Sequence, residues 1–118
     1  MLLVLPISMN SSLKAAEATY RHVVLFKFMD IASPEQIEDV ELAFRALPAK
    51  IDTIQNFEWG TNLSSENLND GYTHCFIVTF KDKTGLDMYL PHTAHKEFLT
   101  TLRGIVDKVL VIDYLTTH

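Results

Sequence analysis

The sequence predicts an α+β fold in which helices cover one four-stranded sheet. Three observations lead to this prediction. Four short segments are rich in β-branched and aromatic residues, as strands are. Two longer stretches repeat apolar residues at the spacing of an amphipathic helix. These elements follow one another in the order β-α-β-β-α-β along 118 residues, a length typical of one domain.

The first part of the chain predicts a strand followed by an amphipathic helix. Residues 20–28 (YRHVVLFKF) have the composition of a strand. Ser33 is placed as an N-cap, Pro34 as the first helical residue, and Gln36 completes a capping box. Apolar side chains then recur at helical spacing until Pro48: Ile37, Val40, Phe44 and Leu47. The acidic side chains of this helix are interpreted as its solvated face: Glu35, Glu38, Asp39 and Glu41.

The middle of the chain predicts two strands joined by a polar loop. Residues 54–62 (IQNFEWGTN) form the second predicted strand, and residues 63–70 (LSSENLND) are dense in turn-forming residues. After Gly71, residues 72–80 (YTHCFIVTF) give the strongest strand signal in the chain. The charged residues 81–83 (KDK) close this third strand.

The last third predicts an interrupted helix and a final strand. Residues 84–106 follow a helical pattern, but Pro91 interrupts it, so two helical pieces are expected. Residues 108–114 (KVLVIDY) form the fourth strand. The complete order is the split βαβ arrangement of ferredoxin-like folds.

The strands do not alternate apolar with polar side chains, as they should if only one sheet face were buried. In the first strand Val23 and Leu25 point one way, while Val24, Phe26 and Phe28 point the other. The third and fourth strands repeat this two-sided pattern. Because two helices can cover only one face, a second copy of the chain is expected to cover the other. The prediction is a homodimer whose sheets close into an α+β barrel.

Composition and charge exclude several classes of partner. Ten basic against fifteen acidic residues give a net charge of −5, which works against sequence-independent binding to nucleic acid. No apolar stretch approaches the roughly 20 residues that cross a bilayer, so no membrane partner is expected. The single cysteine, Cys75, has no second thiol for a disulfide and is interpreted as a small core residue.

Residues 1–19 are interpreted as a leader ahead of a domain that spans residues 20–116. The leader holds a short apolar run at residues 2–7 and a small-x-small sequence at residues 16–18, two features of a secretory signal. It has no basic residue before the apolar run. A cytoplasmic protein is therefore expected. Export with residues 1–18 as a degenerate signal peptide is the alternative.

Five segments of the chain together carry a resemblance to a known family: RHVVLFKF, FEWGTNLS, GYTHCFIVTF, YLPHTAH and DKVLVIDY. In this order and spacing, over about residues 20–115, they resemble the stress-responsive A/B barrel (Dabb) family. The resemblance implies a ferredoxin-like fold that dimerises through its sheets. It leaves the activity open, because the family includes plant stress-induced proteins, bacterial members without an assigned activity, and a plant polyketide cyclase. That cyclase closes a linear tetraketide into an aromatic acid by an aldol condensation.

The resemblance also implies a candidate site in the segment YLPHTAH. In the cyclase a tyrosine and a histidine six residues later are the catalytic pair, and Tyr89 and His95 keep that spacing. His22 and His74 match two further family histidines, and together with His92 they are expected to line a small apolar pocket. The segment departs from the family's HPAH wording, because its proline precedes His92 here.

The chemistry implied for this site needs no cofactor. An aldol closure needs a base beside a carbonyl and a hydrogen-bond donor for the enolate oxygen. His95, with an unperturbed pKa of about 6.5, suits the base, and Tyr89 suits the donor. The alternative is a non-catalytic stress-associated dimer in which these side chains only fill a groove. An open cavity of at least about 300 Å³ beside them would favour a ligand site, and tight packing would favour the alternative.

The histidines do not predict a metal site. Imidazole binds zinc, copper and iron, but the sequence has no HxH or HExxH motif, and His92 and His95, three residues apart, lie at the expected bend. The first functional hypothesis, which rests on the family resemblance, is a homodimer that binds or cyclises a small carbonyl compound. Its expected ligand is a small apolar or aromatic molecule.

Overall fold

The computed structural model describes residues 18–117, so the predicted leader, apart from Ala18 and Thr19, lies outside the described residues. Within this range the elements confirm the predicted order, with the second helix divided in two. The bounds are β1 (Tyr20–Phe28), α2 (Pro34–Arg45), the 3-10 helix η1 (Leu47–Ala49), β2 (Ile54–Thr61), β3 (His74–Phe80), α3 (Lys83–Tyr89), α4 (Thr93–Thr100) and β4 (Val106–Leu115).

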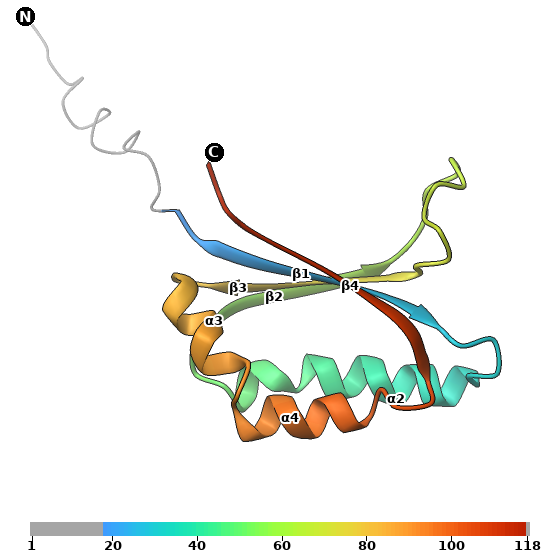
Figure 1. Cartoon of the computed structure of the whole chain (residues 1–118), viewed down its shortest axis with the longest axis horizontal. Coiled ribbons are helices and arrows are strands. Elements are labelled where there is room, and N and C mark those ends of the chain that lie inside the picture. The colour runs from blue at the N-terminus through green and yellow to red at the C-terminus, as the bar shows by residue number, and fades with distance from the viewer. Residues whose placement is uncertain (1–17, 118) are drawn as a thin grey trace, which may run out of the picture.

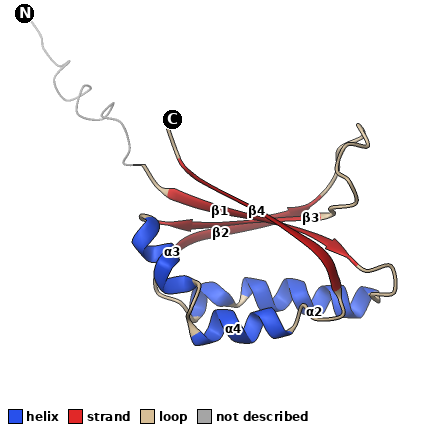
Figure 2. Ribbon diagram, in the orientation of Figure 1, coloured by secondary structure: helices blue, strands red, loops and turns tan. Residues whose placement is uncertain are grey.

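The four strands form one antiparallel sheet in the order β2-β3-β1-β4. The helices all lie against one face of it, so the molecule has two layers, and the other face carries no described helix (Figures 1 and 2). This arrangement confirms the predicted ferredoxin-like α+β fold. No helix within residues 18–117 has the length and apolar character needed to cross a membrane.

Helix α2 begins at the predicted capping box. The Ser33 side chain accepts a hydrogen bond from the Gln36 backbone at 3.1 Å, and the Gln36 side chain accepts one from the Ser33 backbone at 2.9 Å. Pro34 occupies the first helical turn. The helix ends at Arg45, and Pro48 lies within the short η1 that follows. Each N-terminal cap of this kind stabilises a helix by about 1 kcal/mol.

Aromatic side chains form the centre of the core between the helices and the sheet. Phe44 of α2 lies with its ring centroid 4.4 Å from that of Phe76 on β3 and 4.5 Å from that of Phe98 on α4. Phe26 of β1 contacts the same cluster, 5.3 Å from Phe76. Such ring pairs add about 0.5–1.5 kcal/mol each beyond simple burial. The cluster therefore ties both α2 and α4 to the middle of the sheet.

Strand β3 begins at His74, two residues later than predicted. A turn precedes it, in which Tyr72 donates its backbone N–H to the Asn69 carbonyl at 2.8 Å and Asp70 and Gly71 both have positive φ. Glycine suits position 71 because its φ of 82° is a conformation that other residues rarely adopt. The turn keeps Tyr72 out of the sheet.

The face of the sheet without helices is apolar in its middle, which matches the two-sided pattern of the strands. Strand register and alternation place the following side chains on it: Val23, Leu25, Cys75, Ile77, Leu110, Ile112 and Tyr114. Cys75 is half-buried here. The interpretation of Cys75 as a core residue is therefore wrong within one protomer, because it lies on this helix-free face and not beneath the helices.

Candidate functional site

A break between α3 and α4 brings the two residues of the predicted catalytic pair together. Tyr89 is the last residue of α3, Pro91 follows, and His92 caps α4 by accepting the Ala94 backbone N–H on its Nδ1 at 3.0 Å. A straight helix would set residues six apart about 120° from one another. The break instead places the ring centroids of Tyr89 and His95 4.4 Å apart.

Tyr89 and His95 line a cavity between the helices and the outer part of the sheet. Its volume is about 180 Å³, below the roughly 300 Å³ that we expected of a ligand site from typical pockets. An engineered apolar cavity of about 150 Å³ binds benzene, so this one suits a ligand of similar size. The lining is mostly apolar: His22, Val24, Phe26, Phe44, Tyr89, Leu90, His95, Phe98, Leu99, Leu102, Val109 and Val111.

The surroundings of His95 favour its neutral imidazole form. Its Nδ1 lies 2.9 Å from the Leu90 carbonyl oxygen, which can only accept, so Nδ1 carries the proton. Burial lowers the pKa of His95; the Leu90 carbonyl opposes this shift, and the nearby His22 and His92 rings add to it. The remaining nitrogen, Nε2, then carries the lone pair that a general base needs.

Tyr89 presents a buried hydroxyl whose hydrogen-bonding capacity is unused. The residue is 0% exposed, and its hydroxyl has no hydrogen-bond partner among the described residues. Burial raises the pKa of Tyr89 well above the ordinary value of 10.0, so the phenol remains protonated near neutral pH. Buried polar groups without a partner are rare in proteins and call for an explanation. A ligand oxygen would supply the missing acceptor.

His22 extends the site through an acidic partner that the sequence analysis missed. The His22 ring lies edge-on to Tyr89, with centroids 5.8 Å apart, and its Nδ1 is 2.7 Å from the Asp113 carboxylate. Tyr20 donates its hydroxyl to the same carboxylate at 3.3 Å. Asp113 is opposite His22 in the β1–β4 ladder. The available signal was a single acidic residue within the otherwise apolar end of the last strand.

His74 lies elsewhere. Its Nε2 is 2.6 Å from a carboxylate oxygen of Glu41, its Nδ1 is 2.8 Å from the Thr73 hydroxyl, and its ring stacks on Trp59 at 5.9 Å between centroids. It is not among the residues that line the Tyr89 cavity. Glu41 therefore does not belong to the solvated face predicted for α2, because it turns toward this buried histidine.

His92 also lies outside that cavity, since its ring caps α4. The sequence-predicted residues thus divide into three places. Tyr89, His95 and His22 come together, His74 pairs with α2, and His92 serves the helix start. Among residues 18–117, no group of three or more His, Cys, Asp or Glu side chains is arranged to hold a metal ion.

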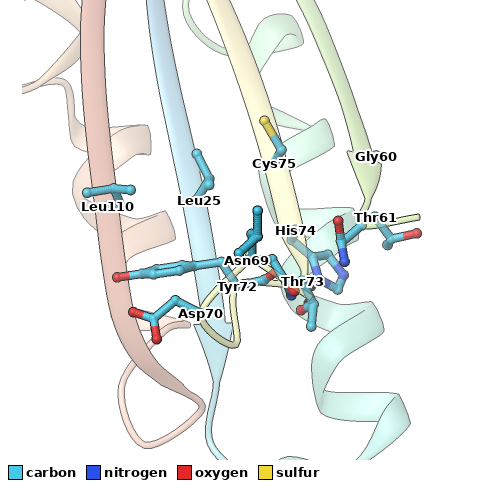
Figure 3. Close-up of a pocket in the computed structure, with 12 residues that line it drawn as sticks. Leu25, Gly60, Thr61, Asn69, Asp70, Tyr72, Thr73, His74, Cys75 and Leu110 are labelled. Atoms are coloured by element: carbon cyan, nitrogen blue, oxygen red, sulfur yellow. Dashed lines mark hydrogen bonds between the residues drawn. The ribbon is translucent and has the colours of Figure 1, made fainter. Parts of the chain in front are cut away.

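A second cavity of about 470 Å³ lies on the helix-free face, beside the loop between β2 and β3. Figure 3 shows Leu25, Cys75 and Leu110 on adjacent strands at this cavity, with Tyr72 and Asp70 of the loop nearby. Its lining includes His74, but neither Tyr89 nor His95. Because it opens on the face predicted to meet a second copy, it belongs to that surface and not to the candidate site.

The family model described as the stress responsive A/B barrel domain matches residues 20–116. The chain belongs to this family. Two relatives are similar in sequence. Protein HS1 of Arabidopsis thaliana is 43% identical over 105 residues, covering 89% of this chain and 96% of HS1. Olivetolic acid cyclase of Cannabis sativa is 30% identical over 94 residues, covering 80% of this chain and 93% of the cyclase.

Solved structures of other proteins share the fold. The crystal structure of At3g17210 from Arabidopsis thaliana has 44% sequence identity and a TM-score of 0.79, covering 84% of this chain and 96% of that one. A ferredoxin-like protein of unknown function from Bacteroides fragilis, described as dimeric, has 26% identity and a TM-score of 0.66, covering 81% and 94%. The dimeric relative supports self-association of this chain.

Proposed function

We propose that this A/B barrel protein is a homodimer in which each protomer binds a small apolar carbonyl compound and activates it by acid–base chemistry. The observation that carries the proposal is the buried Tyr89 hydroxyl, which has no partner among the described residues and lies beside a neutral His95. The similarity to a relative named olivetolic acid cyclase supports a cyclisation reaction.

The proposed reaction uses only side chains of the chain itself. His95 Nε2 takes a proton from the carbon next to the ligand carbonyl, and the C–H electron pair forms the enolate. Tyr89 donates a hydrogen bond to the enolate oxygen as its charge develops. The enolate carbon then attacks a second carbonyl of the same molecule, forming a C–C bond, and the new alkoxide takes the proton back from His95. Both side chains return to their starting state.

Asp113 acts on this chemistry by holding the His22 ring, which packs edge-on against Tyr89. The short hydrogen bond from His22 Nδ1 to the carboxylate fixes the ring beside Tyr89, as carboxylates orient histidines in other active sites. Asp113 is thus a positioning residue, and its replacement by Asn should lower turnover while leaving ligand affinity nearly unchanged.

Hydrogen–deuterium exchange at the methyl group of acetophenone tests the first step. In D₂O the wild-type protein should accelerate this exchange over buffer, and His95→Ala and Tyr89→Phe should abolish most of the acceleration. His92→Asn is the matched control, because asparagine keeps the helix cap and the residue lies outside the cavity. Wild-type exchange no faster than in buffer containing free imidazole, with no shift in protein NMR signals on adding the ketone, would support the non-catalytic dimer instead.

The homodimer is proposed from the apolar helix-free face, on which Leu110 and Ile112 are 40% and 55% exposed in one protomer. Exposed patches of this kind are uncommon on monomers. Sedimentation equilibrium should give a dimer at micromolar concentration, and a monomer would contradict the proposal.

The proposed compartment is the cytoplasm, with export through residues 1–18 as the alternative. The N-terminal sequence of the mature protein, isolated from its source, distinguishes the two. A start at or near Thr19 would favour export.

A further inference from the structure

The helix-free face carries charged side chains among its apolar ones. Lys27 and Lys108 are paired in the β1–β4 ladder at one end, and Lys27 Nζ lies 3.8 Å from an Asp107 carboxylate oxygen. Arg21 and Glu58 lie away from that end. Neither takes part in any ion pair formed within residues 18–117. Arg21, Lys108 and Glu58 on this face are therefore left without a charged partner in the described protomer. Of the two bases, Arg21 is the one with a buried nitrogen that lacks an acceptor among the described residues.

The Arg21 guanidinium has a buried N–H group without a hydrogen-bond acceptor among the described residues. It is half-buried on β1, between Thr79 of β3 and Tyr114 of β4, and its Nε is buried without a hydrogen-bond partner among the described residues. A charged donor kept from water without an acceptor is costly. Covering this face with any apolar surface would bury more of the guanidinium, so the cover must supply an anionic or carbonyl oxygen.

Glu58 is the complementary group. It is an exposed residue of β2, opposite Ile77 of β3, so alternation places it on the same face as Arg21. Two strand spacings and two residues along the chain separate it from Arg21, roughly 12 Å between Cα atoms from standard sheet dimensions. The two side chains form no ion pair within the described protomer.

We propose that Arg21 of each protomer pairs with Glu58 of the partner subunit when two helix-free faces close on one another. The proposal rests on the homodimer proposed above. In a two-fold interface a contact from one residue to another is made twice, so a single acid–base combination gives two ion pairs and adds no net charge. The apolar side chains of the face provide the burial, while the ion pairs select the register in which two copies of the chain meet.

Charge reversal tests this pairing in the full chain. Dimer dissociation constants are measured for the wild type, Arg21→Glu, Glu58→Arg and the double variant, by fluorescence-detected sedimentation of N-terminally labelled protein. Each single reversal should weaken the dimer by about a hundredfold, roughly tenfold for each of its two symmetric copies, from the coupling typical of close interfacial charges. The double variant, which restores opposite charges, should return to within about fivefold of the wild type. Glu38→Arg is the matched control, since Glu38 is exposed on α2, away from this face.

The outcomes separate this pairing from the dimer itself. A wild-type monomer overturns both proposals. A wild-type dimer whose single reversals dissociate like the wild type, or whose double variant stays as weak as the singles, overturns the ion pair alone. If a reversal prevents folding by circular dichroism, Arg21→Gln, Glu58→Gln and their combination replace it. Pairing then requires a coupling of at least tenfold between the two substitutions, and additive effects exclude it.

Discussion

Removing the Tyr89 hydroxyl should stabilise the protein while it impairs the proposed chemistry. The ring is fully buried and packs against His95 and Phe80, so Tyr89→Phe keeps these contacts. It removes a buried donor that has no partner among the described residues, a situation that costs about 1–3 kcal/mol. We therefore expect a gain of about 1 kcal/mol in the free energy of unfolding. In a domain of roughly 100 residues this raises the melting temperature by about 4–8 °C.

Thermal unfolding followed by circular dichroism, at one fixed protein concentration, measures this gain. Tyr20→Phe is the control with the opposite expectation, because its hydroxyl donates to Asp113 and its loss should be neutral or slightly destabilising. In the same preparation, Tyr89→Phe should slow ketone exchange by about 10²–10³, the usual effect of losing one oxyanion donor. A melting temperature below that of the wild type would show that the hydroxyl already has an acceptor in the free protein, and the argument for a ligand would lose its basis.

Three further predictions follow from the same packing. Glu41→Gln should lower the free energy of unfolding by about 1–3 kcal/mol, because it weakens the 2.6 Å contact between Glu41 and His74. Urea denaturation measures this change, and an unchanged midpoint would show that the pair adds no stability. Val78→Asp should unfold the chain, since Val78 is 0% exposed. The Ile77→Asp variant should stay folded by circular dichroism and sediment as a monomer. A dimer of the Ile77→Asp variant would contradict the proposed interface. Ketone exchange should rise with pH as His95 loses its proton, with a midpoint below about pH 6.5, because burial lowers the pKa of His95. A midpoint at or above pH 6.5 would contradict this.

The lowered pKa of His95 also makes the stability of the fold depend on pH. The unfolded chain binds this proton at a higher pH than the folded one, so stability is fully present above about pH 6.5 and decreases as the pH falls toward the folded-state pKa. His95→Gln should flatten the acid side of the stability profile, and an unchanged profile would show that His95 titrates normally.

The sequence predicted those features that local chemistry determines. Ser33 and Gln36 specify a helix start through hydrogen bonds within four residues, and the structure contains both bonds. Pro91 separates two helices because a proline has no N–H for the helix ladder. The two-sided strands predicted an apolar face without helices, since side chains on opposite faces alternate along each strand. Each of these depends on neighbours in the chain.

Features that depend on distant partners were missed. Asp113 and His22 are 91 residues apart, and only the pairing of β1 with β4 sets them opposite one another. Glu41 looked like any other acid of α2 until the fold placed His74 beneath it. The volume of the Tyr89 cavity likewise depends on how Phe98 and Leu102 pack across α4 and the following turn, which no residue spacing encodes.

Strand β4 is an edge strand whose two faces meet different molecules under the proposals above. Val109 and Val111 border the ligand cavity on one side, while Leu110 and Ile112 belong to the helix-free face on the other. A ligand held by the first pair and a partner held by the second both restrain the same ten-residue segment. Any coupling between the two events through this strand is reciprocal: the factor by which a ligand changes subunit association equals the factor by which association changes ligand affinity. Ligand affinity should then depend on protein concentration.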